Sequence, residues 1–425
     1  MWTNSMDKAL RERAEAVIPG GMYGHQSVRL LPDDYPQFFE RASGAYMWDT
    51  DGNRYIDYMC GYGPNLFGYG HESINAAYID QLKKGDTMTG PAGLMVELAE
   101  QMTAMVSHAD WAMFCKNGTD ATTMAMMVAR NFTRKNTVVL AKGAYHGAAP
   151  WCTPVKNGTA PSDRANQVFY TYNDVASLEE AVRKAGDDLA AVFASPIKHD
   201  TFVDQEDPTA EYARRARELC DEKDALLIVD DVRAGFRLAR DSSWARVGVQ
   251  PDLSSWGKAI ANGHPLSALL GAEKARNAAA TIYTTGSYWF SAAPMAASLE
   301  TLRLIRETDY LERTQTLGQR LRKGLDEAGN RHGFALRQSG PAEMPLIMLE
   351  DDPGYSKGYA WNQALLKRGV YFHPWHNMFI CAAMTEADID QTLQAADDAF
   401  KVVREAGPLP PVEKLAILGL LADGH

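Results

Sequence analysis

The run PDLSSWGK at residues 251–258 ends in Lys258, just before the glycine-containing segment AIANG at 259–263. A second apolar run, ALLIVDD at 225–231, ends in two acids, of which Asp230 is the first. Both runs are short and apolar enough to form buried strands. Open α/β sheets bind ligands at the carboxyl ends of such strands. The two runs therefore predict a parallel sheet that brings Lys258 and Asp230 to one edge.

Strand-like runs alternate with segments of helical periodicity through the centre of the chain. Helical spacing is clear at 121–131 and 209–223. This alternation is typical of βαβ units and predicts a large, mainly parallel, seven-stranded sheet. We expect its strands at 111–115, 137–141, 167–170, 190–194, 226–230, 253–256 and 266–271.

The two ends of the chain follow a different pattern. Residues 44–58 predict a β-hairpin around an Asp-Gly-Asn turn. After about residue 300, helical periodicity at 302–305, 317–325 and 385–403 surrounds a strand-like run at 345–349. We expect residues 1–70 and 299–425 to form a smaller α+β domain, and residues 71–298 to form the large domain with the sheet.

The composition excludes several classes of function. The 425 residues are 46% hydrophobic and 23% charged, as in ordinary globular proteins, and the net charge of -11 is unsuited to binding nucleic acid. Five cysteines without paired spacing predict neither disulfides nor a metal site, and favour a reducing, cytoplasmic environment. No apolar run approaches the roughly 20 residues of a membrane span, so no membrane partner is expected.

Lys258 and Asp230 together point to a particular cofactor chemistry. A lysine at the mouth of a buried strand loses solvation, which lowers its pKa and frees its amine to attack a carbonyl. Lysine beside glycine is more often a solvated turn residue, so Lys258 alone decides nothing. A Schiff-base lysine with an aspartate for the ring nitrogen, however, is what a protein supplies to pyridoxal 5'-phosphate (PLP).

Two further segments suit the same cofactor. The loop CKNGTD at 115–120 precedes a helix predicted from Ala121, and amides at that N-terminus, with Gly118 for close approach and the Thr119 hydroxyl beside it, can bind a phosphate, although Thr119 or Asp120 could simply be an N-cap. In GAYHG at 143–147, Tyr145 follows a strand and can stack on a flat ring, although the Tyr145–His146 pair could equally be packing.

In order and spacing, these motifs resemble the class III PLP-dependent aminotransferases of fold type I, in the branch of the glutamate-1-semialdehyde aminomutases. The resemblance spans about residues 18–389 and also includes IPGG at 18–21, YMWDTDG at 46–52 and DDVRAGFR at 230–237. It implies a PLP-binding α/β domain with a smaller domain, and a homodimer with shared active sites.

The resemblance also implies roles for single residues. Lys258 would form the internal aldimine and shuttle a proton, Asp230 would face the ring nitrogen, and Tyr145 would cover the ring. The other cofactor contacts that it implies come from Asn117, Gly118, Thr119, His146, Val232, Asp200 and, from a second subunit, Ser287.

Several positions depart from the family pattern. Asp231 and Asn117 replace the usual Glu and Ser, and Ser195 replaces another Glu. Asp200 falls where an Asn usually lies near the phenolic oxygen of PLP. An ionised Asp200 would repel that oxygen, so either Asp200 is protonated or another group binds there. A glutamate of the aminomutases has no counterpart in the aromatic run FHPWHNMF at 372–379, which disfavours that reaction.

The resemblance places Arg29 where a substrate carboxylate binds, and a guanidinium suits that group. A surface arginine is the alternative. With Tyr62, Trp151, Trp375 and His376 nearby, the donor would be an amino acid with an apolar or aromatic portion.

We therefore expect an aminotransferase that moves an amino group from an amine or amino acid to a keto acceptor. The alternatives are an isomerase, either an aminomutase or a racemase, and a non-catalytic binding module with a PLP fold. The presence of Lys258, Asp230 and Tyr145 argues against the last.

Overall fold

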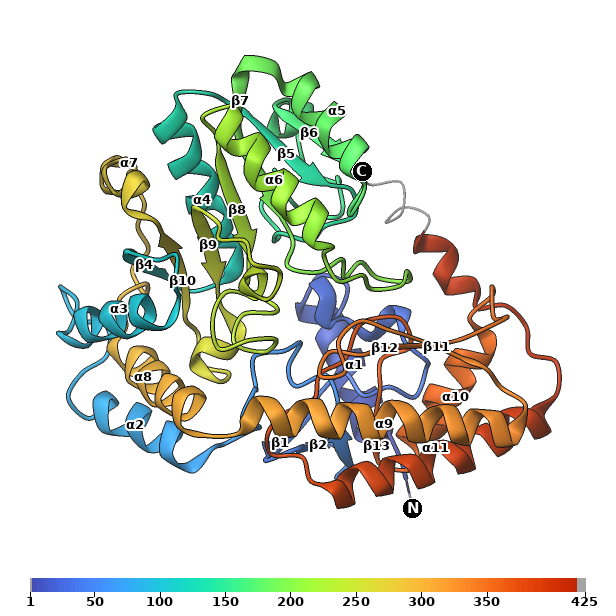
Figure 1. Ribbon diagram of the computed structural model, residues 1–425. Coiled ribbons are helices and arrows are strands. Elements are labelled where there is room, and N and C mark those ends of the chain that lie inside the picture. The colour runs from blue at the N-terminus through green and yellow to red at the C-terminus, as the bar shows by residue number, and fades with distance from the viewer. Residues whose placement is uncertain (1, 419–425) are drawn as a thin grey trace. The chain divides into compact units, whose positions relative to one another are not determined.

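The computed structural model describes residues 2–418, which form two compact units (Figure 1). The sheet unit contains Glu72–Asp200 and Gln205–Leu311. The terminal unit contains the described residues up to His71, the short segment Thr201–Asp204, and the described residues from Glu312 onward.

A seven-stranded sheet in the order β4-β10-β9-β8-β7-β5-β6 is the centre of the sheet unit. The strands from β9 to β6 are parallel, whereas β10 is antiparallel to both of its neighbours. All seven predicted strands are confirmed, with ends that differ by at most one residue. Their bounds are Trp111–Cys115 (β4), Thr137–Ala141 (β5), Gln167–Tyr170 (β6), Leu189–Ala194 (β7), Leu226–Asp230 (β8), Leu253–Trp256 (β9) and Ser267–Gly271 (β10).

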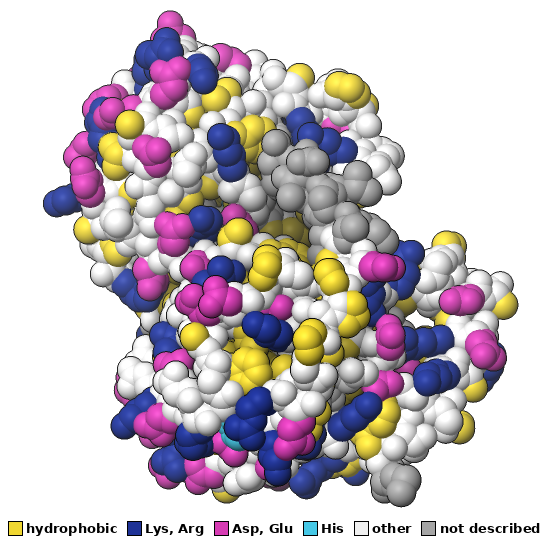
Figure 2. Space-filling model, turned by 90° about the vertical axis from the view of Figure 1, so that its right-hand side faces the viewer, with side chains coloured by type: hydrophobic (Ala, Val, Ile, Leu, Met, Phe, Trp, Pro, Cys, Tyr) yellow, Lys and Arg dark blue, Asp and Glu magenta, His cyan; other side chains and the backbone are white. Residues whose placement is uncertain are grey.

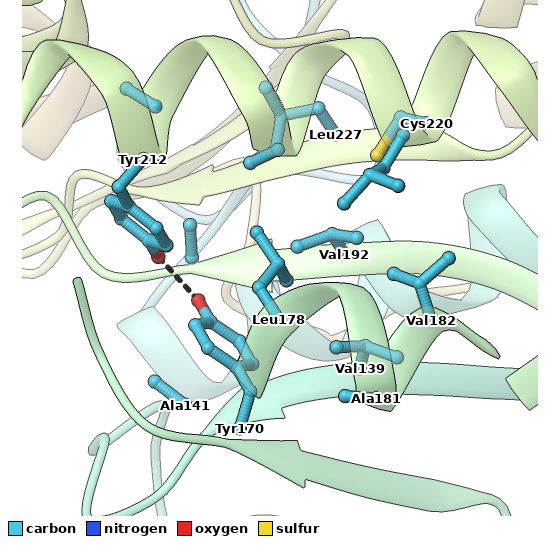
Figure 3. Close-up of a cluster of buried hydrophobic side chains, with 14 of the residues drawn as sticks. Val139, Ala141, Tyr170, Leu178, Ala181, Val182, Val192, Tyr212, Cys220 and Leu227 are labelled. Atoms are coloured by element: carbon cyan, nitrogen blue, oxygen red, sulfur yellow. Dashed lines mark hydrogen bonds between the residues drawn. The ribbon is translucent and has the colours of Figure 1, made fainter. Parts of the chain in front are cut away.

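Helices cover both faces of this sheet. Successive strand residues point to opposite faces. Accordingly, Val138 packs in a core cluster with α4 (Gly118–Thr133) and α7 (Arg276–Thr281), whereas Val139 packs in another cluster. That second cluster contains α5 (Val175–Ala185) and α6 (Ala210–Glu222), and in it the hydroxyls of Tyr170 and Tyr212 are hydrogen-bonded (Figure 3). Burial of each large apolar side chain contributes about 1.5–3 kcal/mol.

Two more helices of the sheet unit, α2 (Glu72–Leu82) and α3 (Leu94–Met105), both pack against a third, α8 (Ala292–Glu307). The expected domain limit at residue 298 falls inside α8. Because α8 packs against α2 and α3, the whole helix lies in the sheet unit.

The terminal unit contains the expected hairpin as β2 (Tyr46–Asp49) and β3 (Arg54–Asp57). Strand β1 (Phe39–Ser43) pairs antiparallel with β2, and β13 (Val370–Tyr371) pairs parallel with β3. Also in this unit are β11 (Leu336–Ser339), β12 (Leu346–Leu349), α1 (Ser5–Val17), α10 (Ser356–Leu366), α11 (Glu386–Ala406) and, from Glu312 onward, α9 (Tyr310–His332).

Within residues 2–418, no helix is long and apolar enough to span a membrane, and no cluster of three or more His, Cys, Asp or Glu side chains could hold a metal ion. All five cysteines are buried free thiols. Acidic and basic side chains are interspersed over the face of the molecule shown in Figure 2.

Candidate active site

The strand order brings the predicted cofactor residues to one edge of the sheet. Lys258 follows β9, Asp230 ends β8, Asp200 lies beyond β7, and Tyr145 lies beyond β5. These strands are parallel and adjacent in the sheet, so their carboxyl ends share an edge. Strand β4 runs in the same direction and leads into Asn117.

Lys258 is half-buried, and its φ of +48° lies in the left-handed region that residues other than glycine rarely adopt. Backbone strain of this kind clusters at functional sites, although ten other non-glycine residues of the described chain also have a positive φ. Burial, and after it the nearby Arg233, lower the pKa of Lys258 to about 8, although Asp230 opposes them. Part of its amine is therefore neutral near pH 8.

Asp230 is held by its neighbours. The ring Nδ1 of His146 lies 2.8 Å from Asp230 Oδ2, and both side chains are buried. The amide of Val232 donates to Asp230 Oδ1 at 3.2 Å, and Thr122 donates its hydroxyl to the His146 carbonyl at 2.7 Å. The carboxylate therefore has a fixed orientation at the end of β8.

The phosphate-binding residues predicted from sequence begin helix α4. Asn117 is the N-cap: its side chain accepts from the amide of Asp120 at 3.2 Å, while Asp120 accepts from the amide of Asn117 at 3.1 Å. Thr119 Oγ1 accepts from the amide of Ala148 at 3.1 Å. Neither Thr119 nor Asp120 is thus the N-cap, and the amides of Gly118 and Thr119 form the first turn.

Val232 lies close to two glycines of this edge. A methyl group on Gly118 would come within 2.7 Å of Val232 Cγ1, and one on Gly257 within 3.4 Å. Val232 therefore lies between the first turn of α4 and the turn that carries Lys258, which is consistent with a position under a flat ring. Tyr145 keeps 39% of its surface exposed, so its ring is available for stacking.

Asp200 packs so closely on Gly143 that a methyl group there would clash with its carboxylate. Burial raises the pKa of Asp200 to about 6. Asp231 is instead held inside the core. Its carboxylate accepts hydrogen bonds from the Ser242 hydroxyl at 2.9 Å and from the Ser243 amide at 3.1 Å.

Two residues of the site were missed by the sequence analysis, namely His199 and Arg233. Arg233 Nη1 donates to the His199 carbonyl at 3.4 Å. Burial lowers the pKa of Arg233 to about 10, against the charges of Tyr145, Asp230 and Asp200. The sequence did contain a sign of Arg233, because this cation directly follows Val232 in the motif DDVRAGFR. His199 Nδ1 and the hydroxyl of Ser195 are buried without a hydrogen-bond partner among the described residues.

Two other predicted residues also lie in the sheet unit. Trp151 is buried in the core cluster around α4, and its indole N–H donates to Thr123 at 3.0 Å, so most of its surface is engaged within this unit. Ser287 is exposed in the loop between α7 and α8.

The remaining predicted substrate residues lie in the terminal unit. The Tyr62 ring packs edge-on against His376 at 5.4 Å, and its hydroxyl donates to the His25 carbonyl at 2.8 Å. Trp375 stacks on Phe202 at 4.5 Å. Arg29 is exposed.

Tyr62 also lines a cavity of about 490 Å³ within the terminal unit. Its walls combine apolar side chains such as Met47 and Met59 with hydrogen-bonding side chains such as Gln26 and Asp57.

The residues of the sheet edge fit PLP. Lys258 has an amine of lowered pKa for the aldehyde, Asp230 offers an oriented carboxylate to the ring nitrogen, and Gly118 and Thr119 offer helix N-terminal amides to the phosphate. Gly118 and Gly257 let the backbones of both turns approach the Val232 side chain closely.

Comparison with known proteins agrees with this chemistry. Residues 32–400 match the family model of class-III aminotransferases. An aminopentol aminotransferase of Sphingopyxis macrogoltabida is 58% identical over 412 residues, which cover 97% of this chain and 98% of that protein. A glutamate-1-semialdehyde 2,1-aminomutase of Polaromonas naphthalenivorans is 32% identical, over 93% of this chain and 96% of that protein.

Among solved structures, the PLP internal aldimine form of the FumI protein from Sphingopyxis sp. MTA144 has a TM-score of 0.94 to this chain and 58% sequence identity. The match covers 95% of this chain and 98% of that one.

Proposed function

This chain belongs to the class-III aminotransferases and transfers an amino group with PLP as its cofactor, and from that premise we propose that its amino donor is a hydroxylated amine without a carboxylate. The observation that carries this proposal is the 58% identity to an aminopentol aminotransferase over nearly the whole chain, whereas the aminomutase is only 32% identical. The name aminopentol denotes an amine with five hydroxyl groups and no acid. The isomerase and non-catalytic alternatives are accordingly disfavoured.

The cavity of the terminal unit supports the same donor class. Gln26 can bond hydroxyl groups, while Met47 and Met59 provide apolar walls. A site that hydrogen-bonds a substrate hydroxyl strongly rejects analogues that lack this hydroxyl, because they leave buried polar groups unpaired. Tyr62, a predicted substrate residue, belongs to this cavity.

We assign the chemical roles to residues of the sheet edge. PLP, when bound, supplies an aldehyde and an electron-withdrawing ring. The Lys258 amine is partly neutral near pH 8 and acts as the base that moves the proton from the donor carbon. Asp230, oriented by His146, places negative charge at the ring nitrogen. The first turn of α4 binds the phosphate.

We also propose a cytoplasmic homodimer in which Ser287 reaches the partner's phosphate site. Tyr283 and Tyr288, in the same loop as Ser287, are 88% and 67% exposed, and large exposed aromatic side chains are typical of contact surfaces. Five buried free thiols are consistent with a reducing compartment.

The donor proposal is tested with matched pairs of amines. In each pair, an amino polyol is compared with the analogue that carries a carboxylate on the amine-bearing carbon, with the same keto acid as acceptor for both. We expect kcat/KM for the amino polyol to exceed that of the acid by at least about tenfold. We also expect Arg29→Gln to leave kcat/KM for the polyol unchanged.

A preference for the acid that disappears in Arg29→Gln would contradict the proposal and establish Arg29 as the carboxylate-binding residue. Formation of an isomer in the absence of any keto acceptor would instead favour the isomerase reaction.

A further inference from the structure

A left-handed turn, residues 60–63, follows shortly after Asp57, the last residue of β3. The φ angles along the turn are +48° for Cys60, +66° for Gly61, +66° for Tyr62 and +106° for Gly63. Glycine adopts such angles readily, whereas the backbones of Cys60 and Tyr62 are strained by them. Strained residues persist where neighbouring contacts fix them, so this turn requires such contacts.

The Asp57 carboxylate provides contacts at the beginning of the turn. Asp57 is buried, its Oδ1 accepts from the amide of Met59 at 2.7 Å, and its Oδ2 accepts from the Tyr69 hydroxyl at 2.6 Å. The amides of Cys60 and Gly61 also interact with this carboxylate. Hydrogen bonds to an ionised carboxylate are stronger than those between neutral groups. One buried carboxylate therefore holds the backbone from which the left-handed turn starts.

The turn carries Tyr62 into the wall of the 490 Å³ cavity. Tyr62 and Gly61 of the turn line this cavity, as do Asp57 and Tyr69. The Tyr62 ring is half-buried, and its hydroxyl donates to the His25 carbonyl at 2.8 Å. The backbone of the turn sets the direction in which the Tyr62 side chain leaves the chain. The geometry of the turn therefore determines the shape of this part of the wall.

The preceding strand of the same sheet, β2, ends in a closely similar carboxylate. Asp49 and Asp57 are each 1% exposed. Asp49 Oδ1 accepts from the amide of Asp51, two residues farther on, at 3.1 Å, and Asp49 Oδ2 accepts from the Tyr55 hydroxyl at 2.6 Å. The same pattern of one amide and one tyrosine therefore occurs at both strand ends. Among the residues that the structure describes, Asp57 lines the cavity and Asp49 does not.

We propose that Asp57 is a positioning residue for the amino donor: its carboxylate fixes the left-handed turn and thereby keeps Tyr62 in the cavity wall. The proposal rests on the assignment of this cavity to the donor. Both Asp57 oxygens accept hydrogen bonds from the protein, so the carboxylate acts through the turn and not by touching the donor. Without it, the turn relaxes, the Tyr62 ring takes other directions, and the donor loses part of its site.

The first experiment measures steady-state kinetics at pH 8 with glucamine, a primary amine with a polyhydroxylated chain, and a keto acid as acceptor. We expect Asp57→Ala to raise KM for glucamine at least about fivefold and to change kcat less than about twofold, because loss of uniform binding raises KM alone. Tyr62→Ala should raise KM at least as much. The double variant should raise it no further than Tyr62→Ala, since both changes remove the same contact.

The second experiment follows hydrogen exchange of the cofactor-free protein, which reports on the turn without any substrate. Asp57→Ala should speed amide exchange in residues 59–63, because the carboxylate no longer holds this backbone. Asp57→Asn keeps an oxygen for the amide of Met59, so it should restore both the slow exchange and the KM for glucamine to within about twofold. PLP titration of each variant should give the dissociation constant of the natural protein.

Asp49→Ala is the matched control, because it removes the same hydrogen-bond pattern from a strand end outside the cavity. We expect it to lower stability in urea as Asp57→Ala does, and to leave the KM for glucamine unchanged. If Asp57→Ala does not fold, Tyr69→Phe is compared with Tyr55→Phe in the same way, since each removes the tyrosine that donates to one of the two carboxylates.

Three results would overturn the proposal while leaving the donor assignment intact: equal rises of KM in Asp57→Ala and Asp49→Ala, a normal KM in Asp57→Ala although Tyr62→Ala raises it, or exchange in residues 59–63 that stays slow in Asp57→Ala. A normal KM in Tyr62→Ala would have a wider consequence. It would place the donor outside this cavity, and the role of Asp57 would be rejected together with that assignment.

Discussion

Two features of Lys258 lower the stability of the fold. Its backbone is left-handed, and its half-buried amine lies near Arg233, which disfavours a second positive charge. The same desolvation makes the amine a usable nucleophile and base at moderate pH. Stability and reactivity are therefore opposed at this one residue.

This opposition predicts that Lys258→Met stabilises the cofactor-free protein. The folded pKa of about 8 lies below the usual 10.5, so the unfolded chain binds more protons between these values and stability rises with pH across that window. Below pH 8 the variant should be more stable by about 2–3 kcal/mol, and the difference should vanish above about pH 10. Urea unfolding at several pH values measures it; a difference independent of pH would contradict the desolvation of Lys258.

At the scale of elements, the start of α4 combines helix capping with the predicted phosphate site. The reciprocal hydrogen bonds of Asn117 and Asp120 fix the first turn, and with it the amides of Gly118 and Thr119. Helix α11 begins with the same arrangement in the terminal unit, where Thr385 and Asp388 cap each other. The chain thus contains a matched pair of caps with different neighbours.

We expect Asn117→Ala and Thr385→Ala each to lower stability by about 1 kcal/mol, because each removes an N-cap side chain. Only Asn117→Ala should also weaken PLP binding, since its first turn is the one assigned to the phosphate. Urea unfolding and PLP titration of both variants test this. Equal effects of the two variants on PLP affinity would show that the cap acts through general stability.

The strands of the sheet could be predicted almost to the residue, because each is a short apolar run bounded by polar turn residues, as in 226–230. The domain boundary near α8 could not be predicted, because the sequence pattern within that helix does not reveal that it packs on α2 and α3. The placement of Lys258 and Asp230 at one edge could also be predicted, because the carboxyl ends of adjacent parallel strands share an edge.

At the scale of the whole molecule, sequence reasoning failed where a role depends on neighbours distant in the chain. Arg233 has an ordinary place in its motif, and its relation to His199 exists only because β7 and β8 are adjacent. The substrate role of Trp151 stays a prediction, and the packing of its indole in the core around α4 was not evident from the sequence. The direction of a side chain is set by the packing of elements, which local spacing does not encode.

In the proposed dimer, Ser287 and Lys258 of one site come from different subunits. Two inactive variants, one at each residue, should therefore restore activity when they are mixed. Lys258→Ala and Ser287→Asp should each be inactive, the first for lack of the amine and the second because its carboxylate repels the phosphate of PLP. When the two variants are unfolded together and refolded as a mixture, half of the dimers are mixed. Each mixed dimer contains one site with an intact Lys258 from one subunit and an intact Ser287 from the other. Transaminase activity should therefore return to about one quarter of the natural level. Mixed variants that stay inactive, although light scattering shows twice the 46.8 kDa mass of the chain, would place Ser287 outside the partner's site.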